Sequence, residues 1–202
     1  MPLESHPKPA QKPIDFSQEK TISSIVKRAL QYTQISHGYA LDLGSGVGRN
    51  SFFLAEEGYS VVAVDQDCNV LRKLAQEAHR RELLIETVCT DMTSYNADAD
   101  RFNLVISINT LHFLPRTDVS KVIALMKSST AIGGIHAVSV QTTHNKPNKV
   151  KRLFDEGELK SYYSDWEILH YSEDWGTPFR LAPQGPVFTK HRAEIIARRR
   201  AK

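Results

Sequence analysis

The stretch LDLGSGVGRN, residues 41–50, decides the fold because it joins an apolar strand to a helix through a glycine loop. Gly44, Gly46 and Gly48 permit positive φ and let a ligand lie against bare main chain. A dinucleotide fingerprint needs a small residue where this sequence has Arg49, and no Gly-Lys-Ser/Thr of a phosphate-binding loop follows. The loop therefore suits the close approach of a ligand that has no pyrophosphate.

Short apolar runs recur on both sides of this loop. They are apolar at both alternating sets of positions, which is typical of strands covered by helices on both faces. The runs are Tyr39–Leu43, Val61–Val64, Ile85–Cys89, Leu104–Ile108 and Ile135–Val140. Helical spacing occupies the stretches between them, namely Asn50–Glu57, Asn69–Arg81 and Thr117–Thr130. This alternation predicts an open, doubly wound α/β sheet with right-handed crossovers.

The two ends of the chain differ from this pattern. Four prolines in the first thirteen residues predict a flexible arm over residues 1–14. Asp15 followed by Gln18 resembles a capping box that opens a helix. Near the C-terminus, Trp166–Tyr171 and Val187–Ile196 predict an antiparallel hairpin at the sheet edge. We therefore expect a single domain over residues 15–202 with a mostly parallel, seven-stranded sheet.

Two carboxylates follow neighbouring strands of this predicted sheet. Asp65 ends the second strand, where a carboxylate can accept hydrogen bonds from both hydroxyls of a ribose; its structural alternative is a helix N-cap. Asp91 follows the third strand, where it can accept from an adenine amino group while Met92 packs on the ring. Together with the loop, these residues predict S-adenosylmethionine, a nucleoside with an amino-acid arm and no phosphate, as the cofactor.

The candidate cofactor-binding residues lie in the loop and at the strand ends. They are Asp42, Gly44, Ser45, Gly46, Gly48, Arg49, Asn50, Asp65, Gln66, Asp91, Met92 and Asn109. Asn109 follows the fourth strand, where this kind of sheet opens its ligand crevice. His112 is a candidate catalytic base, or a histidine at the start of a helix. The histidines lack zinc-site spacing, so we predict no metal.

Three segments carry a resemblance to a known family. Leu41–Leu54 (LDLGSGVGRNSFFL) and Gly58–Asp65 (GYSVVAVD) are similar to segments of many class I S-adenosylmethionine-dependent methyltransferases. Phe154–Asp174 (FDEGELKSYYSDWEILHYSED) resembles more specifically the tellurite-resistance methyltransferases of the TehB type, as do Arg180 and the closing Ala197-Arg198-Arg199. The resemblance implies methyl transfer to a small acceptor, a tellurite- or selenite-type oxyanion.

The sequence departs from the family pattern at two places. Ser45 stands where members often have cysteine, a change that leaves the loop backbone usable. Phe179-Arg180 stands where the family has His-Arg, so the arginine is kept and the histidine is lost, which bears on the oxyanion chemistry. The resemblance implies that Arg180 clamps the oxyanion through its guanidinium fork. The alternative is a surface arginine paired with Glu173 or Asp174.

Composition bounds the class of protein. The chain has 202 residues, of which 41% are hydrophobic and 24% charged, which is ordinary for a globular domain. Its net charge of +3 depends on four cations at the end of the chain, Arg198, Arg199, Arg200 and Lys202. Without a basic face we expect no nucleic-acid partner. We also expect no membrane partner, since no apolar stretch is long enough to span a bilayer.

Only two cysteines occur, Cys68 and Cys89, both in or near apolar segments. We expect them to be reduced, buried thiols, and the protein to be a cytoplasmic monomer or homodimer. The polar segment Thr142–Lys151 is expected to form a lid over the substrate.

Other functions remain open at this stage. One is methyl transfer to a thiol or another small metabolite. A second is a non-catalytic module that binds S-adenosylmethionine, or nucleic acid through Arg198–Lys202. A third is an NAD-dependent oxidoreductase, which Arg49 in the loop and the missing substrate domain oppose.

Overall fold

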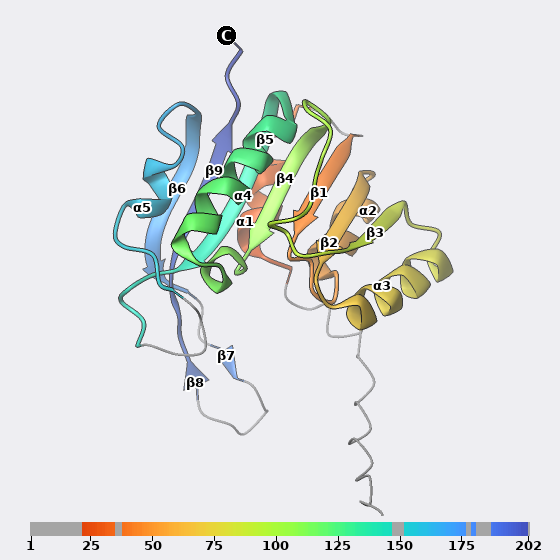
Figure 1. Ribbon diagram of the computed structural model, residues 1–202, viewed down its shortest axis with the longest axis horizontal. Coiled ribbons are helices and arrows are strands. Elements are labelled where there is room, and N and C mark those ends of the chain that lie inside the picture. The colour runs from red at the N-terminus through yellow and green to blue at the C-terminus, as the bar shows by residue number, and fades with distance from the viewer. Residues whose placement is uncertain (1–21, 35–37, 147–151, 177–178, 181–186, 202) are drawn as a thin grey trace, which may run out of the picture.

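The computed structural model describes residues 22–34, 38–146, 152–176, 179–180 and 187–201 (Figure 1). Its main feature is a seven-stranded sheet with the strand order β3-β2-β1-β4-β5-β9-β6. The strands are β1 (Tyr39–Leu43), β2 (Ser60–Asp65), β3 (Ile85–Cys89), β4 (Phe102–Ile108), β5 (Thr130–Gln141), β6 (Glu167–Trp175) and β9 (His191–Arg198). A separate pair, β7 (Phe179–Arg180) and β8 (Val187–Phe188), projects beyond the edge of this sheet.

The first five strands pair in parallel, as the alternating apolar runs predict. β9 is inserted between β5 and β6 and runs antiparallel to both. The predicted C-terminal hairpin is therefore confirmed as an antiparallel pair, but its second strand is the inner one. Val187–Ile196 is not one strand, because β8 ends at Phe188 and β9 begins at His191.

Helices cover both faces of the sheet (Figure 1). They are α1 (Ser24–Leu30), α2 (Arg49–Glu56), α3 (Cys68–Arg80), α4 (Arg116–Ser129), α5 (Glu158–Ser161) and the short 3-10 helix η2 (Leu111–Phe113). α4 and α5 pack on one face through residues such as Val122 and Leu159, and α1 and α2 pack on the other through Val26 and Leu54. This is the predicted doubly wound arrangement, which places the strand ends in a shared crevice.

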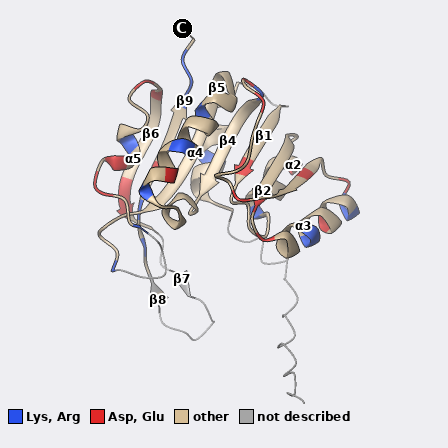
Figure 2. Cartoon of the chain, in the orientation of Figure 1, with Lys and Arg blue, Asp and Glu red and all other residues tan. Residues whose placement is uncertain are grey.

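The described helices are too short or too polar to traverse a lipid bilayer. In Figure 2, the positions of cationic and acidic residues are intermixed along α3, where Arg80 pairs with Glu77. The predicted capping box at Asp15 and Gln18, and the predicted arm over residues 1–14, lie outside the described residues.

The prediction for the two cysteines is wrong. Cys68 and Cys89 form a disulfide, with their Cα atoms 5.2 Å apart, and both residues are exposed. The physical reason is the strand register: β2 and β3 are neighbours, and Asp65 lies opposite Cys89. Cys68 is the first residue of α3 and follows Asp65 by three residues. It therefore lies close to Cys89, although the two cysteines are separated by 21 residues in sequence.

Candidate active site

A cavity of about 520 Å³ lies at the carboxyl ends of the parallel strands. The chain first adds β2 and β3 on one side of β1 and then adds β4 on the other side. The cavity lies at this switch point, which is where sheets of this kind bind ligands. Its lining comes from the ends of four strands: Gly44, Ser45, Gly46, Val47, Arg49, Asn50, Asp65, Gln66, Asp91, Met92, Ile108, Asn109, Thr110, Phe113 and Leu114. The volume suits a nucleoside-sized ligand.

The glycine loop needs its glycines for two different reasons. Gly44 and Gly48 have φ values of +80° and +81°, a region that other residues enter only with strain. A Cβ at Gly44 would lie 2.2 Å from Cγ2 of Thr110, and one at Gly48 would lie 2.4 Å from Cδ1 of Leu74. At Gly46 (φ +54°) no atom would meet a Cβ within 4 Å, so that glycine leaves open space in the wall of the cavity.

One polar atom of the loop is left unsatisfied by the protein. The hydroxyl Oγ of Ser45 is buried and has no hydrogen-bond partner among the described residues. A buried hydroxyl without a partner costs free energy, so native proteins usually supply one. Because Ser45 lines the cavity, a polar group of a bound ligand can satisfy it.

Asp65 lies at the end of β2 and faces the loop. Its Oδ2 accepts a hydrogen bond of 2.8 Å from the amide of Gly46, and its Oδ1 accepts one of 3.0 Å from the amide of Asp67. Each carboxylate oxygen retains a further acceptor direction, so the pair can still take two ligand hydroxyls. The helix N-cap of α3 is Asp67, not Asp65, which removes the structural alternative considered for Asp65.

Asp91, which follows β3, and Asn109, which follows β4, also line the cavity. Asp91 Oδ1 accepts from both the amide (2.8 Å) and the hydroxyl (2.7 Å) of Thr93, which fixes the turn after β3. Met92 is partly buried against the core and lines the cavity beside Asp91. Asn109 adopts φ +56°, an uncommon conformation that is frequent at functional sites.

Asp42 lies beneath the loop and does not line the cavity. It is 1% exposed, and its Oδ2 accepts a 2.7 Å hydrogen bond from the hydroxyl of Ser51 in α2. Burial raises the pKa of Asp42 to about 7, an effect that the Ser51 hydrogen bond and the charge of Arg49 oppose. The geometry makes Asp42 a support that joins β1 to α2.

His112 is also outside the cavity lining. It is fully buried in η2, and its Nδ1 accepts a 3.2 Å hydrogen bond from the main-chain amide of Gln141. Burial and the charges of Arg192 and Lys190 lower its pKa to about 4, so the ring is neutral at neutral pH. This position favours packing over the role of a base.

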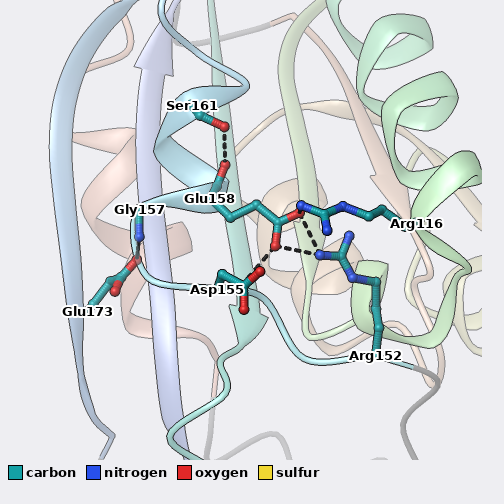
Figure 3. A network of polar contacts seen from close by, with 7 residues as sticks. All are labelled: Arg116, Arg152, Asp155, Gly157, Glu158, Ser161 and Glu173. Atoms are coloured by element: carbon teal, nitrogen blue, oxygen red, sulfur yellow. Dashed lines mark hydrogen bonds and ion pairs between the residues drawn. The ribbon is translucent and has the colours of Figure 1, made fainter.

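A polar network around Glu158, in α5, joins the segment that follows β5 to the start of α4 (Figure 3). The amide of Arg152 donates to the carbonyl of His112 at 3.2 Å, and the guanidinium of Arg152 binds both carboxylate oxygens of Glu158. Glu158 Oε1 is also 3.4 Å from Nη2 of Arg116, at the start of α4. The contact with the His112 carbonyl ties this network to η2, whose Phe113 lines the cavity.

Two sequence predictions fall wholly or partly outside the described residues. The main chain of Arg180 pairs with Val187, but its side chain is not described. Of the proposed lid Thr142–Lys151, residues 147–151 are not described, while Thr142 and Asn145 are buried and hydrogen-bonded to His191. Among the described residues, no group of three or more His, Cys, Asp and Glu side chains is arranged to hold a metal ion.

Sequence analysis missed five residues of the cavity wall, Val47, Ile108, Thr110, Phe113 and Leu114. Each lies within six residues of a predicted site residue, so proximity to the strand ends was the available signal. Apolar and small polar side chains carry no chemical signature of their own. Phe113 is 48% exposed, so solvent reaches part of its side chain in the cavity wall.

Comparison with known proteins places this geometry in a family. A family model described as "Tellurite resistance protein TehB" matches residues 14–191. The chain belongs to the TehB family. It is 32% identical over 169 residues to the "Probable S-adenosyl-L-methionine-dependent methyltransferase TehB" of Haemophilus influenzae (strain ATCC 51907 / DSM 11121 / KW20 / Rd). That match covers 82% of this chain and 59% of the relative, so the chain spans about three fifths of the relative's length.

Solved structures agree on the TehB-family fold. The crystal structure of TehB from Haemophilus influenzae has a TM-score of 0.79 at 30% identity and covers 89% of this chain and 63% of that one. A Burkholderia thailandensis 1,6-didemethyltoxoflavin-N1-methyltransferase with bound S-adenosylhomocysteine has a TM-score of 0.65 at 19% identity, over 88% of this chain and 79% of that one. At that identity the likeness concerns the fold alone. The family model and the TehB relatives of Haemophilus influenzae confirm the family predicted from Phe154–Asp174.

Proposed function

We propose that this TehB-family chain is an S-adenosylmethionine-dependent methyltransferase that acts on a small acceptor. The observation that supports it best is the arrangement around one cavity: the glycine loop exposes its main chain to a ligand, and the carboxylates of Asp65 and Asp91 offer hydrogen-bond acceptors. The names of its relatives agree with this assignment. The orphaned hydroxyl of Ser45 and the open space at Gly46 fit an adenosine with an amino-acid arm, which has polar groups and no bulky phosphates.

The protein's own residues would position the reactants. Asp65 would accept the ribose hydroxyls, Asp91 the adenine amino group, and the loop amides and Ser45 would contact the amino-acid arm. S-adenosylmethionine supplies an electrophilic methyl group, which an acceptor lone pair takes in line while the C–S electron pair returns to sulfur. Alignment of this kind contributes on the order of 7 to 11 kcal/mol to barrier lowering in general. With His112 neutral and hydrogen-bonded, no residue is assigned as base.

The acceptor we propose is a tellurite- or selenite-type oxyanion, on the strength of the family name. A lone pair on selenium or tellurium needs no strong general base, which agrees with the neutral His112. Arg180 is the family-derived clamp for such an anion, and we propose that it binds the acceptor from the β7–β8 pair.

The test combines binding with transfer. Calorimetry should show uptake of S-adenosylmethionine and S-adenosylhomocysteine, and a radiolabelled-methyl assay should show transfer to selenite or tellurite over neutral thiols. Arg180→Ala should lower oxyanion turnover at least tenfold with cofactor binding intact. Well-folded protein that takes up neither cofactor would contradict the methyltransferase; transfer to thiols alone would contradict only the oxyanion.

A further inference from the structure

The Cys68–Cys89 disulfide lies at the rim of the cavity, between two segments that line it. Cys68 is two residues after Gln66, and Cys89 is two residues before Asp91. Gln66 and Asp91 both line the cavity. Asp65 lines it too and lies opposite Cys89 in the register of β2 and β3. The bond therefore connects the two strand ends that carry the carboxylates proposed to hold the ribose and the adenine.

The disulfide joins β3 to α3 at the cavity end of the strand. Among the described strands, β3 pairs with β2 alone, at one edge of the sheet (Figure 1). Alternation along the strand places Ile85, Thr87 and Cys89 on the same face. Ile85 packs against the apolar cluster of α3, but it begins β3 and so lies at the end away from the cavity. At the cavity end, a covalent bond thus provides the connection that apolar packing provides at the other end.

Two main-chain hydrogen bonds also link the rim segments. The amide of Thr90 donates to the carbonyl of Asp65 at 3.0 Å, and the amide of Asp67 donates to Oδ1 of Asp65 at 3.0 Å. Residues 66–69 and Cys89 are all exposed. Exposed segments with few buried apolar contacts are the parts of a folded protein that open most easily. Loss of the disulfide would therefore allow the rim to move while the core stays folded.

The disulfide is accessible to small thiols. Both cysteines are exposed, and the chain has two cysteines in all, so no third thiol competes for either sulfur. Exposed disulfides are commonly the labile ones, which exchange with thiols. A thiolate of the small molecule attacks one sulfur to form a mixed disulfide, and the other cysteine leaves as a thiolate that takes up a proton. A second small thiol attacks the small-molecule sulfur and releases the remaining cysteine. Two small thiols are thereby oxidised to one disulfide, and the protein disulfide is reduced to two thiols.

We propose that the Cys68–Cys89 pair is a redox site that sets the affinity of the cavity for S-adenosylmethionine, and that it reacts with small thiols and their disulfides. The proposal rests on the proposed function, in which Asp65 and Asp91 hold the adenosine. In the oxidised protein, the bond fixes the two carboxylates relative to each other before the cofactor binds. In the reduced protein, the cofactor must order the rim as it binds, and this ordering opposes binding. Oxidation therefore raises the cofactor affinity, and reduction lowers it.

The experiment measures S-adenosylhomocysteine binding by calorimetry under anaerobic conditions, with the full chain oxidised or reduced by dithiothreitol. The reduced protein should bind about threefold to thirtyfold more weakly, because it loses the preorganisation of the rim. Reoxidation with oxidised glutathione should restore the original affinity. The double variant Cys68→Ser with Cys89→Ser should bind as weakly as the reduced protein and should not respond to either reagent.

A second measurement separates a redox site from a disulfide that only stabilises the fold. Cofactor binding and disulfide formation are linked, so a cofactor that prefers the oxidised protein must favour oxidation by the same factor. The protein is equilibrated in glutathione buffers of defined composition, and alkylation with mass spectrometry gives the oxidised fraction. When S-adenosylhomocysteine saturates both forms, half-oxidation should occur at a lower proportion of oxidised glutathione. The shift in the equilibrium constant should equal the ratio of the two affinities.

Gly133→Ala is the matched control for a loss of stability, because Gly133 has φ +78° and lies in β5 outside the cavity lining. It should lower the melting temperature, leave the cofactor affinity within twofold and respond to reduction as wild type does. If the double serine variant failed to fold by circular dichroism, the two wild-type measurements would still decide.

Three results would overturn the proposal: equal affinities of the oxidised and reduced protein, an oxidation equilibrium that the cofactor does not shift, or the same loss of affinity in Gly133→Ala as in the double variant. Each of them leaves cofactor binding by wild-type protein intact. If neither redox form of the wild-type protein took up S-adenosylhomocysteine, the methyltransferase assignment would fail as well, so the two failures are distinguishable.

Discussion

The carboxylate of Asp65, at the end of β2, accepts a 2.8 Å hydrogen bond from the amide of Gly46 in the loop after β1. This contact ties the most open glycine of the loop to the residue proposed to hold the ribose. It lies between two segments that the sheet register brings together, since Leu43 is opposite Val64. The loop and the carboxylate therefore form one preorganised unit, and the predictions below begin with it.

Asp65→Ala should weaken S-adenosylhomocysteine binding by at least tenfold, because it removes the proposed ribose acceptor and the tie to Gly46 together. Calorimetry measures this. Asp67→Ala is the control: Asp67 caps α3 by accepting from the amides of Asn69 and Val70, so its loss should cost about 1 kcal/mol of stability. Its cofactor affinity should stay within twofold. Equal affinity losses in the two variants would argue against the role of Asp65.

Gly48→Ala should be more damaging than Gly46→Ala. Both introduce a Cβ at positive φ, which costs about 1 to 2 kcal/mol, but only at Gly48 does the new atom collide with Leu74. Urea denaturation should show the larger loss of stability for Gly48→Ala. Gly133→Ala in β5 is the control, because Gly133 also has positive φ (+78°) and open space at the position of a Cβ. Its loss of stability should be similar to that of Gly46→Ala, and the cofactor affinity should not change. A Gly48→Ala variant no less stable than Gly133→Ala would contradict the clash.

Reduction of the Cys68–Cys89 disulfide should lower the free energy of unfolding by up to about 3 kcal/mol, because the bond closes a loop with a sequence separation of 21. Urea denaturation with and without dithiothreitol measures the change. The double variant Cys68→Ser with Cys89→Ser should match the reduced protein and show no response to reductant. The disulfide would be excluded if thiol titration found two free cysteines in the protein purified without reductant.

Asp42 should make stability fall as pH rises. In the folded protein burial holds its pKa at about 7, while in the unfolded chain it ionises near its ordinary value of about 4. Between these values the folded state keeps a proton that the unfolded state has released, so the free energy of unfolding decreases by up to about 1.4 kcal/mol per pH unit. Asp42→Asn removes this dependence.

Between pH 5 and pH 7, the stability of Asp42→Asn relative to wild type should therefore rise by about 2 kcal/mol. Chemical denaturation at both pH values gives the difference, in which the contributions of other groups cancel. Ser51→Ala serves as a second variant, because it removes the hydrogen bond that favours the ionised form and should steepen the dependence. A constant difference between Asp42→Asn and wild type would contradict a raised pKa.

Much of the fold could be predicted from periodicity alone. Strands such as Tyr39–Leu43 matched residue for residue, because a mostly apolar run bounded by polar turns has few other ways to bury itself. The helix boundaries differed by a residue or so, as in α2, where the prediction began at Asn50 and the helix begins at Arg49. The glycine loop was recognisable for the same reason: its conformation depends on residues adjacent in sequence.

What the sequence by itself determined was local: which segments are strands, where the loop must take positive φ, and the family signature in Phe154–Asp174. Only the tertiary structure decided which distant residues meet. It inserted β9 between β5 and β6, joined Cys68 to Cys89, and set Arg192 opposite Gln141. Strand order and register depend on how complementary faces pack across the whole core, and no window of neighbouring residues encodes that information.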